Sequence, residues 1–174
     1  MALGYAAETL WCLGYPDQAL ARVQETLKLA EGLEHPFSLV AALRAVSFVQ
    51  LFCRNGEAGH AAAHRLAALS ETHRFPWWSA VGACLQGWAA VEKPAASREL
   101  SEAGLQQLQS GLAAVRAMGA EVFVPRLMGA LAESLARAGE PEAGLAAVAE
   151  ALAMVERNEE RWNEAELHRI KGEL

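Results

Sequence analysis

The sequence is short of the residues that favour strands and covalent cross-links. Among its 174 residues, Asp17 is the only aspartate, Ile170 is the only isoleucine, and there are three cysteines. Leu and Ala supply most of the apolar bulk and Glu nearly all of the acidic charge, and these are strong helix formers, whereas Ile and Thr favour strands. The shortage therefore argues against a β-rich fold and predicts an all-α protein. Because 53% of the residues are hydrophobic, the chain is able to bury a core.

The three cysteines are too few and too scattered for a disulfide framework. Cys12, Cys53 and Cys84 lie far apart, each inside a helical pattern. Such usage fits a reducing cytosol. We expect all three to behave as small buried hydrophobic residues.

The chain also lacks an excess of positive charge and long apolar runs. The net charge is −6 and the basic residues are scattered, which argues against a nucleic-acid surface. No apolar run approaches the ~20 residues of a membrane-spanning helix, and residues 1–6 lack the basic start of a signal peptide. We therefore expect a cytoplasmic protein with no membrane partner, although residues 171–174 resemble an ER-retrieval tail.

The sequence does contain one segment that recurs four times in similar form. The matching stretches are 14–20, 56–62, 102–105 and 139–145, and they end at Leu20, Ala62, Leu105 and Leu145, which are 42, 43 and 40 residues apart. A period of this size is typical of a solenoid of stacked units. Because stacking leaves an extended concave surface, the repeat indicates binding rather than catalysis.

Apolar periodicity and turn residues divide the chain into paired helices. Helices are predicted at about 2–13, 16–32, 36–54, 57–74, 76–92, 98–118, 120–138, 141–157 and 160–174, with no strand. They form one domain, 1–174, with units 1–34, 35–75, 76–118 and 119–158 and a terminal helix over 160–174. About five residues within 93–101 are extra, and we expect them to form an exposed loop.

The second helices of the units share an apolar comb with spacings of 3, 4 and 3 residues. This spacing keeps one stripe facing the neighbouring helices. The second unit breaks the comb, so its stripe is expected to pass through Leu66. The three regular combs are Leu20, Val23, Leu27 and Ala30; Leu105, Leu108, Leu112 and Val115; and Leu145, Val148, Leu152 and Val155.

Small residues at fixed places resemble those of tetratricopeptide repeats. Counted back from the turns, the small residue of the first helix falls on Ala7, Gly87 and Ala132, while the second unit departs with Val49. The small residue of the second helix falls on Ala19, Ala61, Gly104 and Gly144. The period of about 42 exceeds the usual 34 of that family.

These long units, with segments such as 10–20 and 165–174, resemble the C-terminal helical-repeat region of large bacterial signalling proteins. Those proteins carry a STAND-type ATPase, often with an adenylate-cyclase, kinase or DNA-binding domain. The resemblance implies a right-handed α-solenoid of four hairpins plus one terminal helix. It also implies that the protein takes part in signal transduction. None of the catalytic modules of such proteins is found in this sequence.

Residues able to support chemistry are few. His60 and His64 lie one helical turn apart, a spacing that is able to hold two metal ligands, but a solvated helix face explains them more simply. Ser70, Glu71 and His73 are close in sequence but point in different directions on a helix. We therefore expect no catalytic site, metal or cofactor.

A concave groove is the expected binding site. Trp77 and Trp78 are adjacent, so one is expected to pack while the other lines the groove or the junction of the second and third units. Aromatic residues of this kind anchor interfaces, but partial burial of both is the simpler alternative. The groove is expected to be apolar early and charged late, a gradient suited to an amphipathic segment; burial by adjoining helices is the alternative. By repeat position its further residues are Leu43, Val46, Gln50, Val81, Cys84, Trp88, Arg126, Gly129 and Glu133.

The sequence thus predicts a non-enzymatic module for protein–protein interaction or regulation, belonging to a larger signalling protein and bound to a protein, a peptide or a neighbouring domain. The alternative is a small-molecule sensor with an apolar ligand near Trp77 and Trp88; a closed cavity with converging polar groups would favour it. The first helix, with Leu3, and the last, with Ile170 and Leu174, carry apolar residues. Self-association through these terminal helices is therefore expected.

Overall fold

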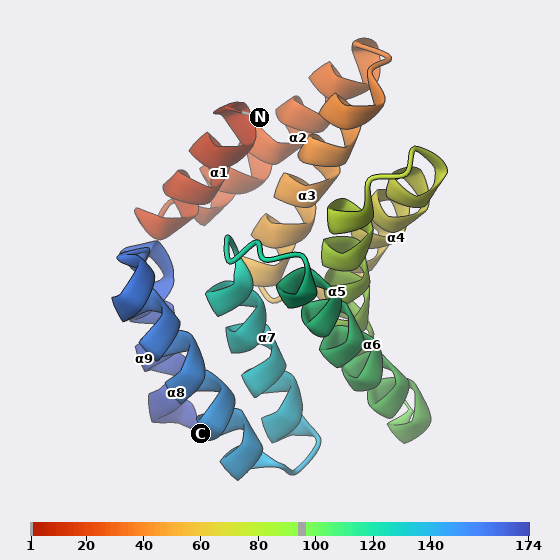
Figure 1. Ribbon diagram of the computed structural model, residues 1–174. Helices are drawn as coiled ribbons and strands as arrows, with labels where there is room; N and C mark the ends of the chain where they lie inside the picture. Colours follow the sequence, from red (N-terminus) through yellow and green to blue (C-terminus); the bar gives the residue numbers. More distant parts are fainter. Residues whose placement is uncertain (1, 94–96) are drawn as a thin grey trace.

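The protein is all-helical. The computed structural model describes residues 2–93 and 97–174, and within these ranges it contains nine α-helices, one short 3₁₀-helix and no strand, which confirms the predicted fold class (Figure 1). The helices are α1 (Ala2–Cys12), α2 (Pro16–Gly32), α3 (Pro36–Phe52), α4 (Gly56–Thr72), α5 (Pro76–Glu92), α6 (Arg98–Ala117), α7 (Val124–Arg137), α8 (Pro141–Asn158) and α9 (Glu164–Glu173), and the 3₁₀-helix is η1 (Arg161–Asn163).

Helices α2 to α5 begin at intervals of 20 residues, which we call the 20-residue rhythm. Helices α2 to α5 each contain 17 residues and are separated by three-residue turns. After seven of the nine helices in the described residues, one residue adopts a left-handed backbone, and these residues are Gly14, Glu34, Arg54, Arg74, Gly119, Gly139 and Glu159. A left-handed residue just past a helix end lets the chain satisfy the last carbonyl groups and reverse direction. The pair period in the first half is therefore 40 residues, from Gly14 to Arg54, and the predicted interval of 42 is wrong.

The error lies in which residue of the second unit corresponds to Gly14. The sequence comparison matched Gly56, but Gly56 lies in the first turn of α4, and Arg54 has the left-handed backbone with φ of 55°. Counted from Arg54, the small positions of this unit are Ser47 and Gly59 rather than Val49 and Ala61. Ser47 and Gly59 are buried, whereas Ala61 is exposed. The second unit therefore has the same small–small pattern as the others.

The two helices of a pair approach each other most closely at these small residues. A Cβ atom on Gly87 of α5 would stand 2.4 Å from the carbonyl oxygen of Gly104 on α6. A Cβ atom on Gly144 of α8 would stand 2.9 Å from the carbonyl oxygen of Ala132 on α7. Side chains larger than hydrogen would force these backbones apart, so the glycines set the spacing within each pair.

The predicted comb is confirmed at seven of its twelve positions, and at the other five the buried residue lies one position earlier. The seven confirmed residues are Val23, Ala30, Leu108, Leu112, Val115, Val148 and Val155. Ala19, Gly104 and Gly144 are the buried residues at the start of α2, α6 and α8, and the leucines that follow them are only half-buried or exposed. Leu152 is likewise half-buried, whereas its neighbour Ala151 is buried. Small residues allow the helices to approach each other, and the leucines then lie at the edges of the contact. Leu66 is fully buried, as expected for the second unit.

Helices adjacent in sequence pack against each other, and the row of pairs curls back on itself, in the manner of an α-solenoid (Figure 1). Helices α3, α5 and α7 also contact one another, as do α1 and α3 and α7 and α9. We call the side formed by these odd-numbered helices the inner face. The curl brings the end of α1 toward the loop before α9, because Trp11 of α1 and Trp162 of η1 both pack on Phe52, with ring centroids 4.6 and 6.2 Å from it.

Two helices begin later than predicted. Most helices start two residues after the left-handed residue, as α8 does after Gly139. Helix α7 starts five residues after Gly119, and α9 starts five residues after Glu159. The predicted starts near 120 and 160 are therefore wrong, and the intervening residues form a turn in the first case and η1 in the second.

The predicted extra segment at 93–101 is partly helical. Ser97 caps α6, since its hydroxyl accepts the backbone N–H of Leu100 at 3.2 Å, and residues 98–101 form the first turn of that helix. Residues 94–96 lie outside the described residues, and with them the central part of this prediction. In the described ranges, no helix combines the length and apolar character needed to cross a bilayer.

Candidate binding site

The inner face is filled rather than open. Of the residues predicted to line a groove, seven have side chains that are almost completely buried, so the groove prediction is wrong for them and the packing alternative holds. These are Leu43, Val46 and Gln50 on α3, Val81, Cys84 and Trp88 on α5, and Arg126 on α7. Gly129 of α7 is also buried, against Leu167 and Ile170 of α9.

Several of these side chains point toward the second helices, not the concave side. The Cys84 thiol lies 3.8 Å from the carbonyl oxygen of Leu108 on α6, and burial raises its pKa to about 12. Trp88 packs where a Cβ atom on Gly59 of α4 would meet its ring at 2.7 Å. Cys84 therefore lies in the contact between the two helices of the third unit, and Trp88 lies in the contact between the second and third units.

The paired tryptophans are both half-buried. Their rings meet edge to face at 4.6 Å, while Trp77 also approaches Phe123 at 6.1 Å and Trp78 approaches Phe37 at 6.0 Å. Trp77 therefore faces the inner side and Trp78 faces the junction of the second and third units. This matches the packing alternative for the pair.

Aromatic rings and two buried arginines occupy the inner face. The inner aromatic cluster consists of Trp11, Phe48, Phe52, Phe123 and Trp162, with neighbouring ring centroids 4.6 to 6.2 Å apart. The Arg126 guanidinium lies over the Phe52 ring at 4.8 Å. The Arg44 guanidinium lies against Tyr5, Phe48 and Phe123 at 4.8, 5.5 and 4.9 Å. Stacking on rings lets these cations be buried at reduced cost.

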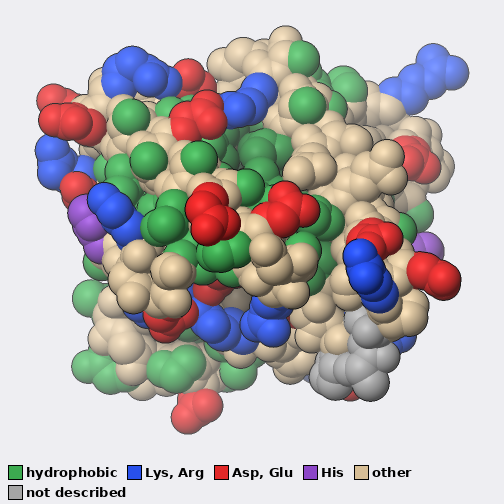
Figure 2. Space-filling view, turned by 90° about the horizontal axis from the view of Figure 1, so that it is seen from below, with side chains coloured by type: hydrophobic (Ala, Val, Ile, Leu, Met, Phe, Trp, Pro, Cys, Tyr) green, Lys and Arg blue, Asp and Glu red, His purple; other side chains and the backbone are tan. Residues whose placement is uncertain are grey.

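Charged residues at the C-terminal ends of the odd-numbered helices form a network. Arg169 of α9 lies 2.9 Å from Glu133, 2.7 Å from Glu166 and 2.5 Å from Glu173. Arg54, which follows α3, pairs with Glu133 and Glu173. Figure 2, seen from below, shows acidic and basic side chains gathered around the middle of this end of the molecule. The predicted site residue Glu133 therefore joins α3, α7 and α9.

One hollow of about 430 Å³ remains beside the inner aromatic cluster. We call it the α1 hollow, because one wall is a face of α1 and the opposite wall is made by the segments before α7 and α9. Sequence reasoning did not single out any of its residues as a binding site. The lining residues are Tyr5, Glu8, Thr9, Cys12, Val122, Phe123, Glu160 and Trp162.

The two walls opposite α1 are the two places where a helix starts late. Residues 120–123 and 160–163 interrupt the 20-residue rhythm and supply Val122, Phe123, Glu160 and Trp162 to the α1 hollow. Phe123 is buried and has a left-handed backbone with φ of 67°. Such backbones are costly for bulky residues and gather at functional sites. A signal was present in the sequence, because proline follows the turn glycine by two positions at Gly14 and Gly139 but by six positions at Gly119.

A buried ion pair lies at the base of the α1 hollow. Glu8 is 6% exposed, and its Oε1 lies 2.7 Å from Nη2 of Arg44, which is 2% exposed. Burial raises the pKa of Glu8, and the opposing effect of Arg44 is smaller. The Arg44 Nη1 has no hydrogen-bond partner among the described residues. The pair therefore places a carboxylate and a guanidinium in an environment of aromatic rings.

The rim of the α1 hollow is more exposed. Trp162 is 39% exposed, and its indole N–H donates to Glu160 Oε1 at 2.6 Å. Of the three cysteines expected to be buried, only Cys84 is; Cys53 is half-buried, and Cys12 is exposed on the wall of the hollow. Burial of its thiol and the Glu8 carboxylate both raise the pKa of Cys12. A raised pKa disfavours the thiolate, so this geometry does not make Cys12 a nucleophile.

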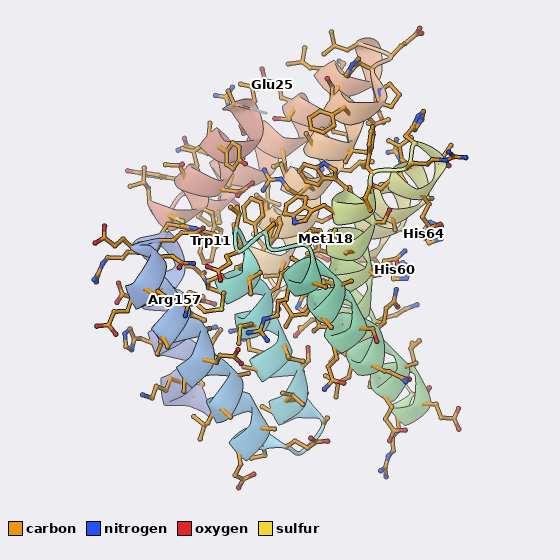
Figure 3. The ribbon with its side chains drawn as sticks, viewed as in Figure 1. Trp11, Glu25, His60, His64, Met118 and Arg157 are labelled. Carbon is orange, nitrogen blue, oxygen red and sulfur yellow. The ribbon has the colours of Figure 1, made fainter. Side chains whose placement is uncertain are left out.

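The residues considered for chemistry lie elsewhere. Figure 3 shows His60 and His64 on the outer side of α4, away from the neighbouring helices, and their rings are 6.4 Å apart. Among the described residues no three His, Cys, Asp or Glu side chains form a metal-sized group. The buried Ser70 hydroxyl donates to the carbonyl oxygen of Leu66 at 2.6 Å, while His73 stacks on Phe75. Ser70 and His73 thus have separate partners.

The terminal helices differ from the expectation of bare apolar ends. Leu167 and Ile170 of α9 are fully buried and Leu174 is half-buried, so the last helix leaves mainly polar residues and part of Trp162 exposed. The reason is that α9 packs its apolar side on α7. On α1, by contrast, Leu3 is 36% exposed, and Leu13, just beyond it, is 65% exposed.

Comparison with models of known families, with curated proteins and with solved structures finds no match for this chain. The fold and its hollow thus define a curled α-helical repeat protein in which sequence-adjacent helices pack in pairs.

Proposed function

We propose that the chain is a non-enzymatic regulatory module of a larger bacterial signalling protein, and that it binds a small, largely apolar ligand in the α1 hollow. In this proposal the helices form a right-handed superhelix of four tetratricopeptide-like hairpins and one terminal helix. The proposal takes up the sensor alternative, but with a different site from the one near Trp77 and Trp88.

The observation that carries the proposal is the composition of the α1 hollow. Aromatic side chains from three separate segments meet two carboxylates around about 430 Å³ of space. Small-molecule sites are concave, mostly apolar and supplied with a few converging polar groups, and their volumes are ~300–1,000 Å³. A peptide groove has less support, because seven of the residues expected to line it are buried.

A neutral fluorescent probe tests the proposal. N-phenyl-1-naphthylamine is uncharged at neutral pH and brightens in apolar sites, so the wild-type chain should bind it saturably. The variant Thr9→Phe adds a ring on the wall of the α1 hollow, and we expect about tenfold weaker binding, which corresponds to about 1.4 kcal/mol. The control Ala6→Phe adds the same ring to the exposed side of α1.

Equal binding by both phenylalanine variants would place the probe outside the α1 hollow and contradict the proposal. No saturable binding by the wild-type chain would contradict it as well. Circular dichroism melting of each variant checks that both remain folded.

A protein partner is the second candidate, and the exposed part of α1 and its turn favours it. Leu3, Leu13 and Tyr15 are 36%, 65% and 51% exposed and lie on α1 or just after it. Leu13 and Tyr15 lie in the same turn, and exposed apolar side chains that lie close together tend to become contacts. Light scattering over a concentration series, with Leu13→Glu as the comparison, would detect self-association through this surface. A monomer at all concentrations would remove this contact as a route to self-association.

A further inference from the structure

We propose that the ligand of the α1 hollow is an organic cation with an apolar body. This inference rests on the proposed function and specifies the chemistry of the ligand at the same site.

Among the described residues that line the α1 hollow there are acidic but no basic side chains. Glu8 and Glu160 are the two ionisable carboxyl groups, and the remaining lining residues are aromatic, aliphatic or uncharged. The positive charge of Arg44, at the base of the hollow, neutralises the negative charge of the Glu8 carboxylate. Glu160 accepts a hydrogen bond from the neutral indole of Trp162 and makes no ion pair among the described residues. One negative charge therefore remains at the rim.

The aromatic rings of the α1 hollow suit a cation. Tyr5, Phe123 and Trp162 come from α1, from the segment before α7 and from η1, so they surround the space from different sides. The face of an aromatic ring carries partial negative charge and attracts ammonium and guanidinium groups, most strongly when water is excluded. Rings that line a site in company with a carboxylate favour a cation over an anion.

The protein already uses these rings for a cation of its own. The Arg44 guanidinium lies 4.8 Å from the centroid of Tyr5 and 4.9 Å from that of Phe123. Arg44 therefore shows that a planar cation is stable against these two side chains when a carboxylate is adjacent. The same combination of ring and carboxylate recurs at the rim in Trp162 and Glu160, for which the described part of the chain supplies no basic partner.

The experiment uses two probes of nearly the same shape and opposite charge. Tetraphenylphosphonium is a lipophilic cation and tetraphenylborate is the matching anion, and both are titrated into the whole chain by calorimetry. We expect the cation to bind at least about tenfold more tightly than the anion, as one unscreened charge contact and ring contacts permit.

Two variants locate the charge that selects the cation. Glu160→Gln removes the unpaired carboxylate at the rim with little change of shape, and we expect it to weaken binding of the phosphonium about tenfold. Glu99→Gln makes the same change in net charge on exposed α6, and we expect binding within about twofold of the wild type because distant surface charges are screened.

The outcomes separate this inference from the proposed function. Binding of the neutral naphthylamine together with equal affinity for the two ions, or a preference for the borate, would overturn the cation inference alone. Equal losses in Glu160→Gln and Glu99→Gln would also overturn it. Failure of all three probes to bind would overturn the proposed function itself.

Discussion

Two buried arginines show how differently the same residue type is accommodated. Arg44 lies 2.7 Å from Glu8, and Glu8 has no second basic partner in the described part of the chain. Arg126 lies 3.6 Å from Glu166, whose carboxylate is also held by Arg169 at 2.7 Å. Burial lowers the pKa of Arg126 to about 10. Burial alone would raise the pKa of Glu166, but the Arg169 hydrogen bonds and nearby arginine charges bring it below its usual range.

Replacing each arginine by methionine should therefore have unequal effects. Arg44→Met leaves the Glu8 carboxylate buried without its partner, and we expect a loss of about 3–5 kcal/mol in the free energy of unfolding. Arg126→Met leaves Glu166 paired with Arg169, so we expect a change within about 1 kcal/mol. Urea denaturation of both variants measures the difference, and equal losses would contradict this account of the two charges.

The partly displaced comb makes a second prediction at the residue scale. Leu112 is buried and Leu152 is half-buried, although the sequence pattern treats them as equivalent. We expect Leu112→Ala to cost about 2–5 kcal/mol and Leu152→Ala clearly less, because the cost depends on the cavity left behind. Denaturation midpoints of the two variants decide the order. A larger loss for Leu152→Ala would show that the stripe of α8 is not the one described.

Most burial could be predicted from the sequence because apolar spacing is local, but the position of the second-unit turn could not. Arg54 adopts a left-handed backbone that L residues other than glycine seldom use. Since Gly56 follows two residues later, any alignment by glycine shifts the unit. Glu34 and Arg74 adopt the same left-handed backbone at neighbouring turns. Turns of this kind are therefore not marked by glycine in this sequence.

At the scale of helices, close approach of the backbones decides how α5 packs on α6. Gly87→Ala would place a methyl group 2.4 Å from a carbonyl oxygen and 2.5 Å from the backbone nitrogen of Leu108. Because backbone atoms on both sides cannot move cheaply, we expect a loss of about 2 kcal/mol or more. Gly32→Ala, in a helix with open space around it, should be neutral or stabilising by up to about 1 kcal/mol. Thermal unfolding of the two variants tests this contrast, and a harmless Gly87→Ala would contradict the close approach.

The helices themselves were largely predictable, whereas two of their starts were not. Proline and glycine mark the regular turns. Apolar residues at helical spacing mark the bodies of α2 to α5, each of which is 17 residues long. The starts of α7 and α9 depend on Phe123 and Trp162 packing against Phe48 and Phe52 of α3. Because these contacts join units distant in sequence, periodicity within one helix does not report them. The α1 hollow escaped prediction for the same reason.

At the scale of the whole molecule, ion pairs as well as apolar contacts hold α9 against α7. It has ten residues and buries only Leu167 and Ile170, and a helix so short is marginal without tertiary contacts. Arg169 contacts three carboxylates at the centre of the network. Arg169 therefore joins α9 to Glu133 of α7, which also pairs with Arg54 at the end of α3.

Arg169→Met should loosen α9 without unfolding the rest of the chain. We expect amide hydrogen exchange over 164–173 to become about tenfold faster, which corresponds to a loss of about 1.4 kcal/mol in local stability. Exchange in α4, which does not share the network, serves as the internal reference. Uniform acceleration in both helices would mean that the network stabilises the fold globally, and unchanged exchange in α9 would mean that packing alone holds it.

The central claim is that the α1 hollow, built where the repeat rhythm breaks, is the place where this protein binds its ligand. The most direct test is a ¹H–¹⁵N spectrum of the indole N–H groups of the five tryptophans during titration with tetraphenylphosphonium. The account predicts that the Trp162 signal, assigned with a Trp162→Phe variant, shifts first and saturably, while that of buried Trp88 stays in place. A stationary Trp162 signal, or equal movement of all five signals, would contradict the claim.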